Sequence, residues 1–234
     1  MPAKNSLKQY LENGFYHLYN RGVEKRNIFQ DEQDYGVFLS YLKEYLMPKN
    51  EKELYLQLSD PNITSKERAR LLKLLRMNNF YGEIDLLSYS LMPNHFHFMI
   101  HQRSLESIDR FMNSIGTRYT MYFNEKNKRV GSLCQGVYKA VLIESDEQLL
   151  HLSKYIHRQA LFFKPASKGE ALRSWKEKQP SSFPDYLNLR KTSWIRTDEI
   201  LSFYSKSKKN SSQSYEAFVI EGEQSEIINK LLID

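Results

Sequence analysis

The stretch Ser90-Leu91-Met92-Pro93-Asn94-His95-Phe96-His97-Phe98-Met99-Ile100-His101 decides how this chain is expected to fold. Pro93-Asn94 is a turn dipeptide between two runs in which apolar residues alternate with others, and this pattern predicts a β-hairpin. A hairpin that turns at this dipeptide has three cross-strand pairs, namely Leu91 with Phe96, Tyr89 with Phe98, and Ser90 with His97.

The second strand of this hairpin has two different faces, because successive side chains of a strand point to opposite sides. The apolar face, which we expect to be buried, carries Phe96, Phe98 and Ile100. The other face carries His95, His97, Met99 and His101. Two imidazoles two residues apart on a packed strand are a preorganised half of a metal site. The same pattern is also common on a half-exposed polar face, so the strand alone leaves both interpretations open.

Length and composition predict a globular protein. The 234 residues, of which 41% are hydrophobic, are enough for one core with an appendage or for two small domains. No apolar run is long enough to cross a bilayer, and the first residues contain no apolar signal core. The single cysteine, Cys134, excludes an internal disulfide framework and a Cys-based zinc site. We therefore expect a cytoplasmic protein with no membrane partner.

The charge balance is moderately basic, with 34 Lys and Arg against 28 Asp and Glu, a formal charge of +6 and a pI of about 9.1. Sixteen tyrosines and thirteen phenylalanines accompany these cations. Aromatic faces stack on unpaired bases and cations follow phosphates, so the composition favours a nucleic-acid partner and a nucleoid-associated location. Many basic proteins bind nothing anionic, so the charge alone does not decide between these classes.

The order of the elements predicts an α+β fold. A strand, a helix, the hairpin, a helix, a strand and a helix follow one another over residues 15–22, 31–46, 84–101, 105–124, 136–144 and 146–163. All but the last helix form the split βαββαβ arrangement of ferredoxin-like and RRM-like folds, an antiparallel sheet with helices on one face. The histidine face of the sheet would then be open.

Two segments lie outside this arrangement, and we expect the first to be an insertion and the second a C-terminal extension. Residues 48–80 are highly charged and contain a helix that Thr64 and Glu67 begin as a capping box. We expect either a solvated helix lying on the core or a DNA-contacting appendage, since the helix has an apolar side surrounded by Lys66, Arg68, Arg70, Lys73 and Arg76. The main domain would span 10–165. The extension, 166–234, would consist of loops and short helices, with a flexible Lys206–Ser214.

The helix over 146–163 places two polar side chains beside its core stripe. At about 100° per residue, Tyr155 and Gln159 lie together on one shoulder of the stripe. His157 falls on the opposite shoulder, and Lys154 and Arg158 point furthest outward. A tyrosine at a core boundary is often only a packing residue with a satisfied hydroxyl, and the pattern alone does not exclude this.

Five motifs in matching order resemble those of the single-tyrosine HUH nucleases, whose name denotes histidine, hydrophobic residue, histidine. They are Met92–His97, Tyr16–Gly22, Tyr119–Asn124, Gln135–Ala140 and Leu152–His157. The closest resemblance is to REP-associated tyrosine transposases, relatives of the small bacterial insertion-sequence transposases. It runs from about residue 14 to 163 and extends weakly through 180–187 and 197–201.

The resemblance implies a metal-dependent single-stranded DNA endonuclease and strand transferase that acts next to imperfect DNA hairpins. By this resemblance, His95, His97 and Gln159 hold one Mg²⁺ or Mn²⁺, and the ion polarises the scissile phosphate. Tyr155 attacks phosphorus and leaves a 5′-phosphotyrosine and a free 3′-OH. The covalent bond conserves the phosphodiester energy, which suits strand transfer better than hydrolysis.

Other roles stay open at this stage. Candidate phosphate contacts are Arg21, Arg118, Lys154 and Arg158, although solvated cations look the same in sequence. The chain departs from the family pattern in carrying Gln159-Ala160 in place of the common Asn-Pro, and Val137 in place of an arginine. A domesticated, catalytically weak hairpin-DNA-binding protein and a metal-dependent hydrolase are the alternatives. Both a monomer and a homodimer, with Tyr155 acting in its own subunit or in its partner's, are compatible with the sequence.

Overall fold

The centre of the molecule is a four-stranded antiparallel sheet, seen in a computed structural model that describes residues 10–161, 180–204, 211–221 and 225–232. The strands are β1 (Gly14–Arg21), β2 (Ile84–Met92), β3 (His95–Gln102) and β4 (Lys139–Ile143), in the order β2-β3-β1-β4. The β2–β3 hairpin turns at Pro93-Asn94, and its register contains the three pairs expected from the sequence. The predicted hairpin is therefore confirmed.

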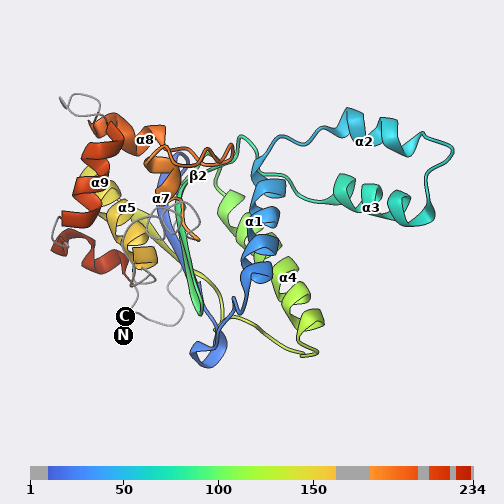
Figure 1. The fold of residues 1–234 in the computed structure, drawn as a ribbon, viewed down its shortest axis with the longest axis horizontal. Helices are drawn as coiled ribbons and strands as arrows, with labels where there is room; N and C mark the ends of the chain where they lie inside the picture. Colours follow the sequence, from blue (N-terminus) through green and yellow to red (C-terminus); the bar gives the residue numbers. More distant parts are fainter. Residues whose placement is uncertain (1–9, 162–179, 205–210, 222–224, 233–234) are drawn as a thin grey trace.

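One face of the sheet carries the two helices that the split βαββαβ order requires. These are α1 (Glu32–Leu46), whose N-terminus is capped by the Asp31 side chain, and α4 (Ser107–Lys126) (Figure 1). Between these helices and the sheet lies an aromatic-rich core that includes Phe38, Leu42, Phe96, Phe98, Ile100 and Phe111. The predicted fold class and the predicted apolar face of β3 are thus both confirmed.

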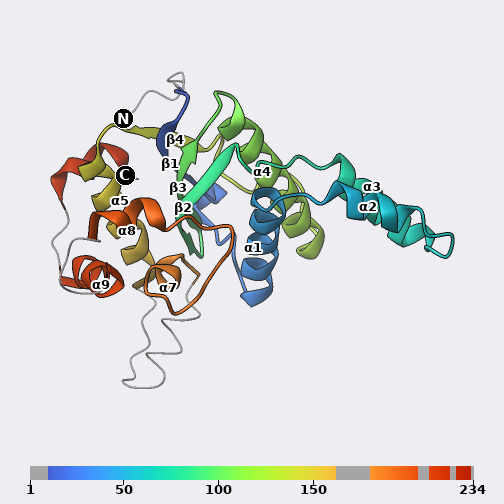
Figure 2. The same cartoon turned by 90° about the horizontal axis from the view of Figure 1, so that it is seen from above.

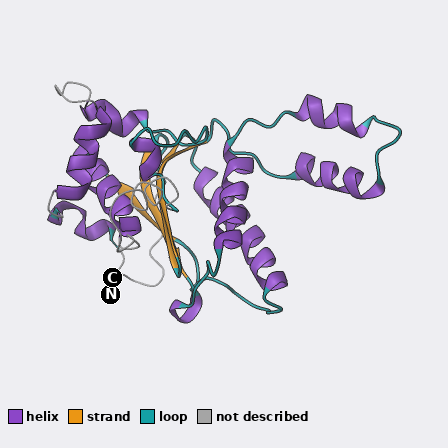
Figure 3. Ribbon diagram, viewed as in Figure 1, coloured by secondary structure: helices purple, strands orange, loops and turns teal. Residues whose placement is uncertain are grey.

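The opposite face, which we expected to be open, is covered. Here α5 (Asp146–Leu161) packs on β2 and β3, and the C-terminal extension packs around it (Figures 1 and 2). The extension contains α7 (Phe183–Tyr186), α8 (Asp198–Leu201), η2 (Ser202–Tyr204), α9 (Ser211–Glu221) and η3 (Glu226–Leu231). Leu87 and Met99 point to this side and join Leu152, Ile156 and Tyr215 in a second core. These apolar side chains explain why the face is covered, and Figure 3 shows the resulting three layers.

The extension also covers the edge of the sheet. Backbone hydrogen bonds join Leu91 N–H to the Pro180 carbonyl and Ser182 N–H to the Tyr89 carbonyl, and Arg196 N–H donates to the Leu86 carbonyl. The β2 edge is therefore paired rather than exposed. The expected boundary at 165/166 and most of the expected flexible segment 206–214 lie outside the described residues. The last residues of that segment, from Ser211, begin α9.

The insertion is a helical hairpin that projects away from the rest of the molecule (Figures 1 and 2). It consists of α2 (Glu51–Leu58) and α3 (Ser65–Arg76), and the predicted capping box of Thr64 and Glu67 is present. At its base the Lys49 ammonium donates to the backbone carbonyls of Leu75 and Met77. The expectation that this helix lies on the core is wrong, because α2 buries no residue and α3 packs mainly on α2.

A short helical turn, η1 (Val23–Lys25), follows β1. Within the described ranges, no helix combines the length and the apolarity that a bilayer crossing requires.

Candidate metal and nucleophile site

His95 and His97 lie at the start of β3, on the face that α5 covers. Their ring centroids are 5.0 Å apart and their planes are nearly perpendicular, at 86°. Across the sheet, β1 places Arg21 opposite His95 and Tyr19 opposite His97. His97 is fully buried, whereas His95 is half-buried. The two imidazoles therefore share one face of a fixed strand, as the alternation predicted.

The hydrogen bonds of the two rings leave one nitrogen of each available. His97 Nδ1 is 2.9 Å from His17 Nε2, and His97 Nε2 is buried with no hydrogen-bond partner among the described residues. The Asn94 side-chain nitrogen donates to the Lys25 carbonyl, so its oxygen is the group that accepts from His95 Nδ1–H at 2.6 Å. A neutral His95 then carries its lone pair on Nε2. An unpartnered imidazole nitrogen with a free lone pair is a donor atom that can bind a metal ion.

The electrostatics of the site keep both rings uncharged. Burial lowers the pKa of His95 to about 4, and the nearby Arg21 charge adds to this effect. Burial, with smaller contributions from His17, His95 and Arg21, also holds the pKa of His97 well below its usual value. Neutral imidazoles bind a metal without first losing a proton, so these rings fit a divalent cation at neutral pH.

Tyr155 of α5 lies against His97 and His17. Its ring centroid is 5.4 Å from that of His97, edge to face at 88°, and 6.4 Å from that of His17. Burial raises the pKa of the Tyr155 phenol, and the Arg21 charge opposes this rise. Arg21 itself has a buried Nε with no hydrogen-bond partner among the residues that the structure describes. The Tyr155 phenol, the Arg21 guanidinium and the two imidazoles therefore lie in one site.

Gln159 is one helical turn beyond Tyr155 on α5 and is half-buried. In the described part of the chain, no group of three His, Cys, Asp or Glu side chains could hold a metal ion. A third protein donor would therefore have to be of another type, which is consistent with the amide of Gln159. Its role as a ligand stays a prediction, since no contact places its amide at the histidines. His101 lies near the other end of β3, stacked on Phe15 and 3.6 Å from Asp85.

Three of the predicted phosphate contacts lie in quite different environments from that of Arg21. Arg118 is on α4, on the opposite face of the sheet, where it pairs with Glu44 at 2.6 Å and stacks 3.7 Å above the Tyr41 ring. Lys154 was expected to point outward, and this is wrong. It is 3% exposed with its ammonium 4.8 Å from the Phe218 ring, because α9 covers that side of α5. Arg158 is half-buried on α5.

His157 plays no part in the histidine cluster, as its position on the opposite shoulder predicted. Its two ring nitrogens contact the Tyr215 hydroxyl at 2.7 Å and the Ser182 hydroxyl at 2.8 Å. Both partners belong to the C-terminal extension. His157 thus connects α5 to the segment that covers it.

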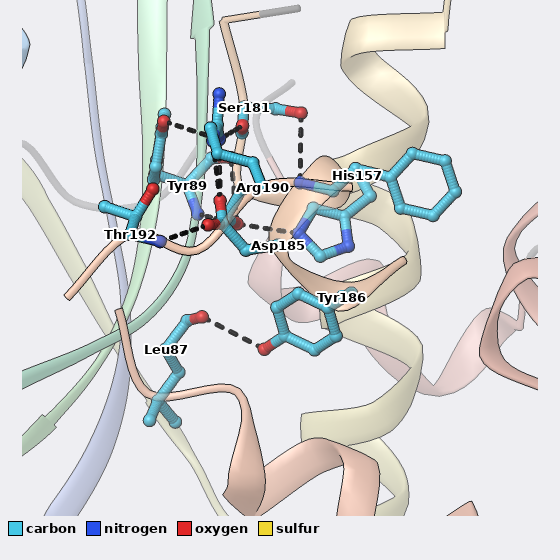
Figure 4. Close-up of polar contacts among 10 residues, drawn as sticks. Leu87, Tyr89, His157, Ser181, Asp185, Tyr186, Arg190 and Thr192 are labelled. Atoms are coloured by element: carbon cyan, nitrogen blue, oxygen red, sulfur yellow. Dashed lines mark hydrogen bonds and ion pairs between the residues drawn. The ribbon is translucent and has the colours of Figure 1, made fainter. Parts of the chain in front are cut away.

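A polar network holds residues 181–192 of the extension over β2 and α5 (Figure 4). The Arg190 guanidinium donates to the Asp185 carboxylate at 2.7 Å, to the Tyr89 hydroxyl at 3.2 Å and to the Ser181 carbonyl. The other oxygen of Asp185 accepts from Thr192 N–H at 2.7 Å. In the same region, the Tyr186 hydroxyl donates to the Leu87 carbonyl of β2.

His17 is the site residue that the sequence analysis missed. It lies in the Tyr16–Gly22 motif, and alternation along the strand puts it on the same face as Tyr19 and Arg21. That alternation was a usable signal. It brings His17 next to His97 only because β1 pairs with β3, and the local periodicity of β1 does not show this pairing.

Comparison with known families gives one match. Residues 59–159 match the family described as "Transposase IS200 like". The chain is similar to IS200-like transposases. The resemblance to small insertion-sequence transposases is thereby confirmed, and the IS200-like match contains His95, His97, Tyr155 and Gln159. It begins between α2 and α3, so β1 with His17 and Arg21 lies outside it.

Two solved structures are similar to this chain at low identity. One is a REP-associated tyrosine transposase bound to a REP hairpin, 9% identical, with a TM-score of 0.42 over 82% of this chain and 97% of that one. The other is a Deinococcus radiodurans R1 protein assigned as a transposase, 13% identical, with a TM-score of 0.35 over 66% of this chain and 97% of that one. At TM-scores below 0.5, neither similarity establishes a shared function. No curated protein matches the chain.

Proposed function

We propose that this protein is a metal-dependent single-stranded DNA endonuclease and strand transferase that acts next to DNA hairpins through a 5′-phosphotyrosine at Tyr155. One observation supports this more than any other. The Tyr155 ring lies 5.4 Å from the His97 ring, and His97 Nε2 is buried without a partner. A nucleophile beside an imidazole nitrogen that can bind a metal ion is suited to metal-assisted phosphoryl transfer.

His95, His97 and Gln159 would hold one Mg²⁺ or Mn²⁺. A bound divalent cation supplies positive charge to the scissile phosphate and holds it in place for in-line attack. The chain's own contribution is a pair of neutral imidazoles whose orientation is fixed by β3. Two imidazoles and one amide make a weak site for a hard cation, so we expect a DNA phosphate oxygen to complete it.

Tyr155 would act as the nucleophile. Its phenolic oxygen forms a bond to phosphorus, the bond from phosphorus to the 3′ oxygen breaks, the phenolic proton passes to solvent, and the leaving oxygen takes up a proton. Burial raises the pKa of this phenol, so a nearby positive charge is needed to favour the phenolate. Arg21 supplies one such charge, and its unpartnered Nε is suited to donate to the phosphate.

The geometry supports attack by Tyr155 on DNA bound to its own subunit. Tyr155 and His97 of one chain are already in ring contact, so a partner chain is not needed to bring them together. A homodimer would then serve DNA recognition rather than assembly of the reactive groups.

The test is a covalent adduct. Wild type and Tyr155→Phe are incubated with labelled single-stranded hairpin DNA and Mn²⁺ and resolved on denaturing gels. We expect a protein–DNA adduct in wild type only, abolished by EDTA and by His97→Ala. Tight hairpin binding without an adduct would favour the domesticated hairpin-binding protein. Cleavage that persists in Tyr155→Phe would favour a hydrolase.

A further inference from the structure

A chain of hydrogen bonds runs from the C-terminal segment to the metal-facing histidine. His17 Nδ1 is 2.5 Å from the backbone carbonyl oxygen of Leu231, and His17 Nε2 is 2.9 Å from His97 Nδ1. The two rings are stacked, with centroids 5.1 Å apart and planes within 15°. His17, His97 and Leu231 are all buried, so water does not compete for these bonds.

The direction of each bond follows from the chemistry of the groups. A carbonyl oxygen can only accept, so the hydrogen between Leu231 and His17 sits on His17 Nδ1. A neutral imidazole has one donor and one acceptor nitrogen, so with its hydrogen on Nδ1, His17 carries its lone pair on Nε2. That lone pair can only accept, which places the hydrogen of His97 on Nδ1. His97 Nε2 is therefore the bare nitrogen, and it is the buried atom without a partner.

We propose that His17 is a positioning residue that fixes the tautomer and ring orientation of His97, with the Leu231 carbonyl of the C-terminal segment as the anchor of the relay. The inference rests on the proposed function in one respect, namely that His97 Nε2 is the nitrogen that binds the cation. Outer hydrogen bonds of this kind orient a ligating imidazole and raise its basicity.

The two residues that flank this relay, His17 and Leu231, come from distant parts of the chain. His17 lies on β1, opposite Met99, so it is the diagonal neighbour of His97 across the β1–β3 pair. Leu231 ends η3, which packs on α5 and β4. The C-terminal extension therefore does more than cover apolar surface, because it selects which nitrogen of His97 faces the site.

The first measurement reads the tautomer directly in the full, metal-free protein. Long-range ¹H–¹⁵N correlation spectra distinguish Nδ1–H from Nε2–H imidazoles, and for wild type we expect His97 in the Nδ1–H form. A wild-type His97 with its hydrogen on Nε2 would overturn the proposal. This measurement needs no variant, so it stands even if a substitution at His17 unfolds the protein.

The second measurement is Mn²⁺ affinity by titration calorimetry of three variants. His17→Phe keeps a ring of similar shape but has no acceptor, and we expect its Mn²⁺ dissociation constant to rise roughly 10- to 100-fold. His17→Gln offers an amide oxygen near the former Nε2 position, so it should retain most of the affinity. His157→Phe removes another fully buried, doubly hydrogen-bonded histidine from the same layer and should leave the affinity unchanged.

Wild-type affinity in His17→Phe, or an equal loss in His157→Phe, would refute the positioning role. These readouts do not involve DNA cleavage. A missing Tyr155 adduct together with the expected tautomer and affinities would therefore refute the phosphotyrosine chemistry while leaving the role of His17 intact.

Discussion

The ion pair of Asp185 and Arg190 holds the C-terminal extension against the sheet, and removing its cation should be costly. The Asp185 side chain is only 3% exposed, and both Nε and Nη2 of Arg190 donate to one of its oxygens, at 3.0 and 2.7 Å. In Arg190→Gln this carboxylate would lose its cation while remaining buried. The Tyr89 hydroxyl and the Ser181 carbonyl would each lose a donor as well.

The expected magnitude follows from the burial of the two partners. Removing one partner of a buried ion pair costs roughly 3–5 kcal/mol, because the remaining charge is left uncompensated. The Arg190 side chain is 29% exposed, so water reaches part of this site and the low end of that range, about 3 kcal/mol, is expected. Asp185→Asn/Arg190→Gln removes both charges and keeps an acceptor for Thr192 N–H. It should therefore be more stable than Arg190→Gln alone.

The assay is guanidinium unfolding at neutral pH of wild type, the two single variants and the double variant. Arg26→Gln is the matched control, since Arg26 pairs with Glu24, whose side chain is 80% exposed, and such a pair should contribute nothing measurable. If Arg190→Gln unfolds at the wild-type midpoint, or if the four free energies of unfolding are additive, the pair does not hold the extension in the way that its burial indicates.

Two further predictions concern His157 and Arg21. Burial lowers the pKa of His157 to about 3, against about 6.5 in an unfolded chain. Below about pH 6.5 the unfolded state therefore binds a proton at this histidine that the folded state does not bind. This contribution to stability is complete above that pH and is lost as the pH falls toward 3, at about 1.4 kcal/mol per pH unit. Between about pH 7 and about pH 5, the free energy of unfolding of His157→Phe, measured in urea, should therefore fall by about 2 kcal/mol less than that of wild type. An unchanged pH slope would contradict this. Arg21→Gln should slow formation of the Tyr155 adduct about 100-fold with much less effect on hairpin binding, because a donor near the phosphate and the phenol is lost. Arg103→Gln, which breaks an ion pair with Asp85 far from His95 and His97, should react at the wild-type rate, and equal rates for both variants would exclude a role for Arg21 in the chemistry.

Local sequence patterns predicted most of the fold. Alternation around Pro93-Asn94 predicted the hairpin and its register, since each side chain of a strand must point to one of two faces. The Thr64 and Glu67 capping box predicted the start of α3, because it depends on residues only three apart. Helical spacing likewise placed Tyr155 and His157 on opposite sides of α5.

What the sequence by itself determined is therefore the strands and helices of the βαββαβ core, the helix that follows them, the two faces of β3 and the motif residues His95, His97 and Tyr155. Only the tertiary structure decided that the histidine face is covered, that Lys154 is buried beneath α9, and that Arg118 lies on the other side of the sheet. Only it decided that His17 and Leu231, 214 positions apart, meet in one hydrogen bond. The physical reason is range: strand and helix periodicities reach a few residues along the chain, whereas layer packing and the partners of a buried imidazole depend on contacts that no local period encodes.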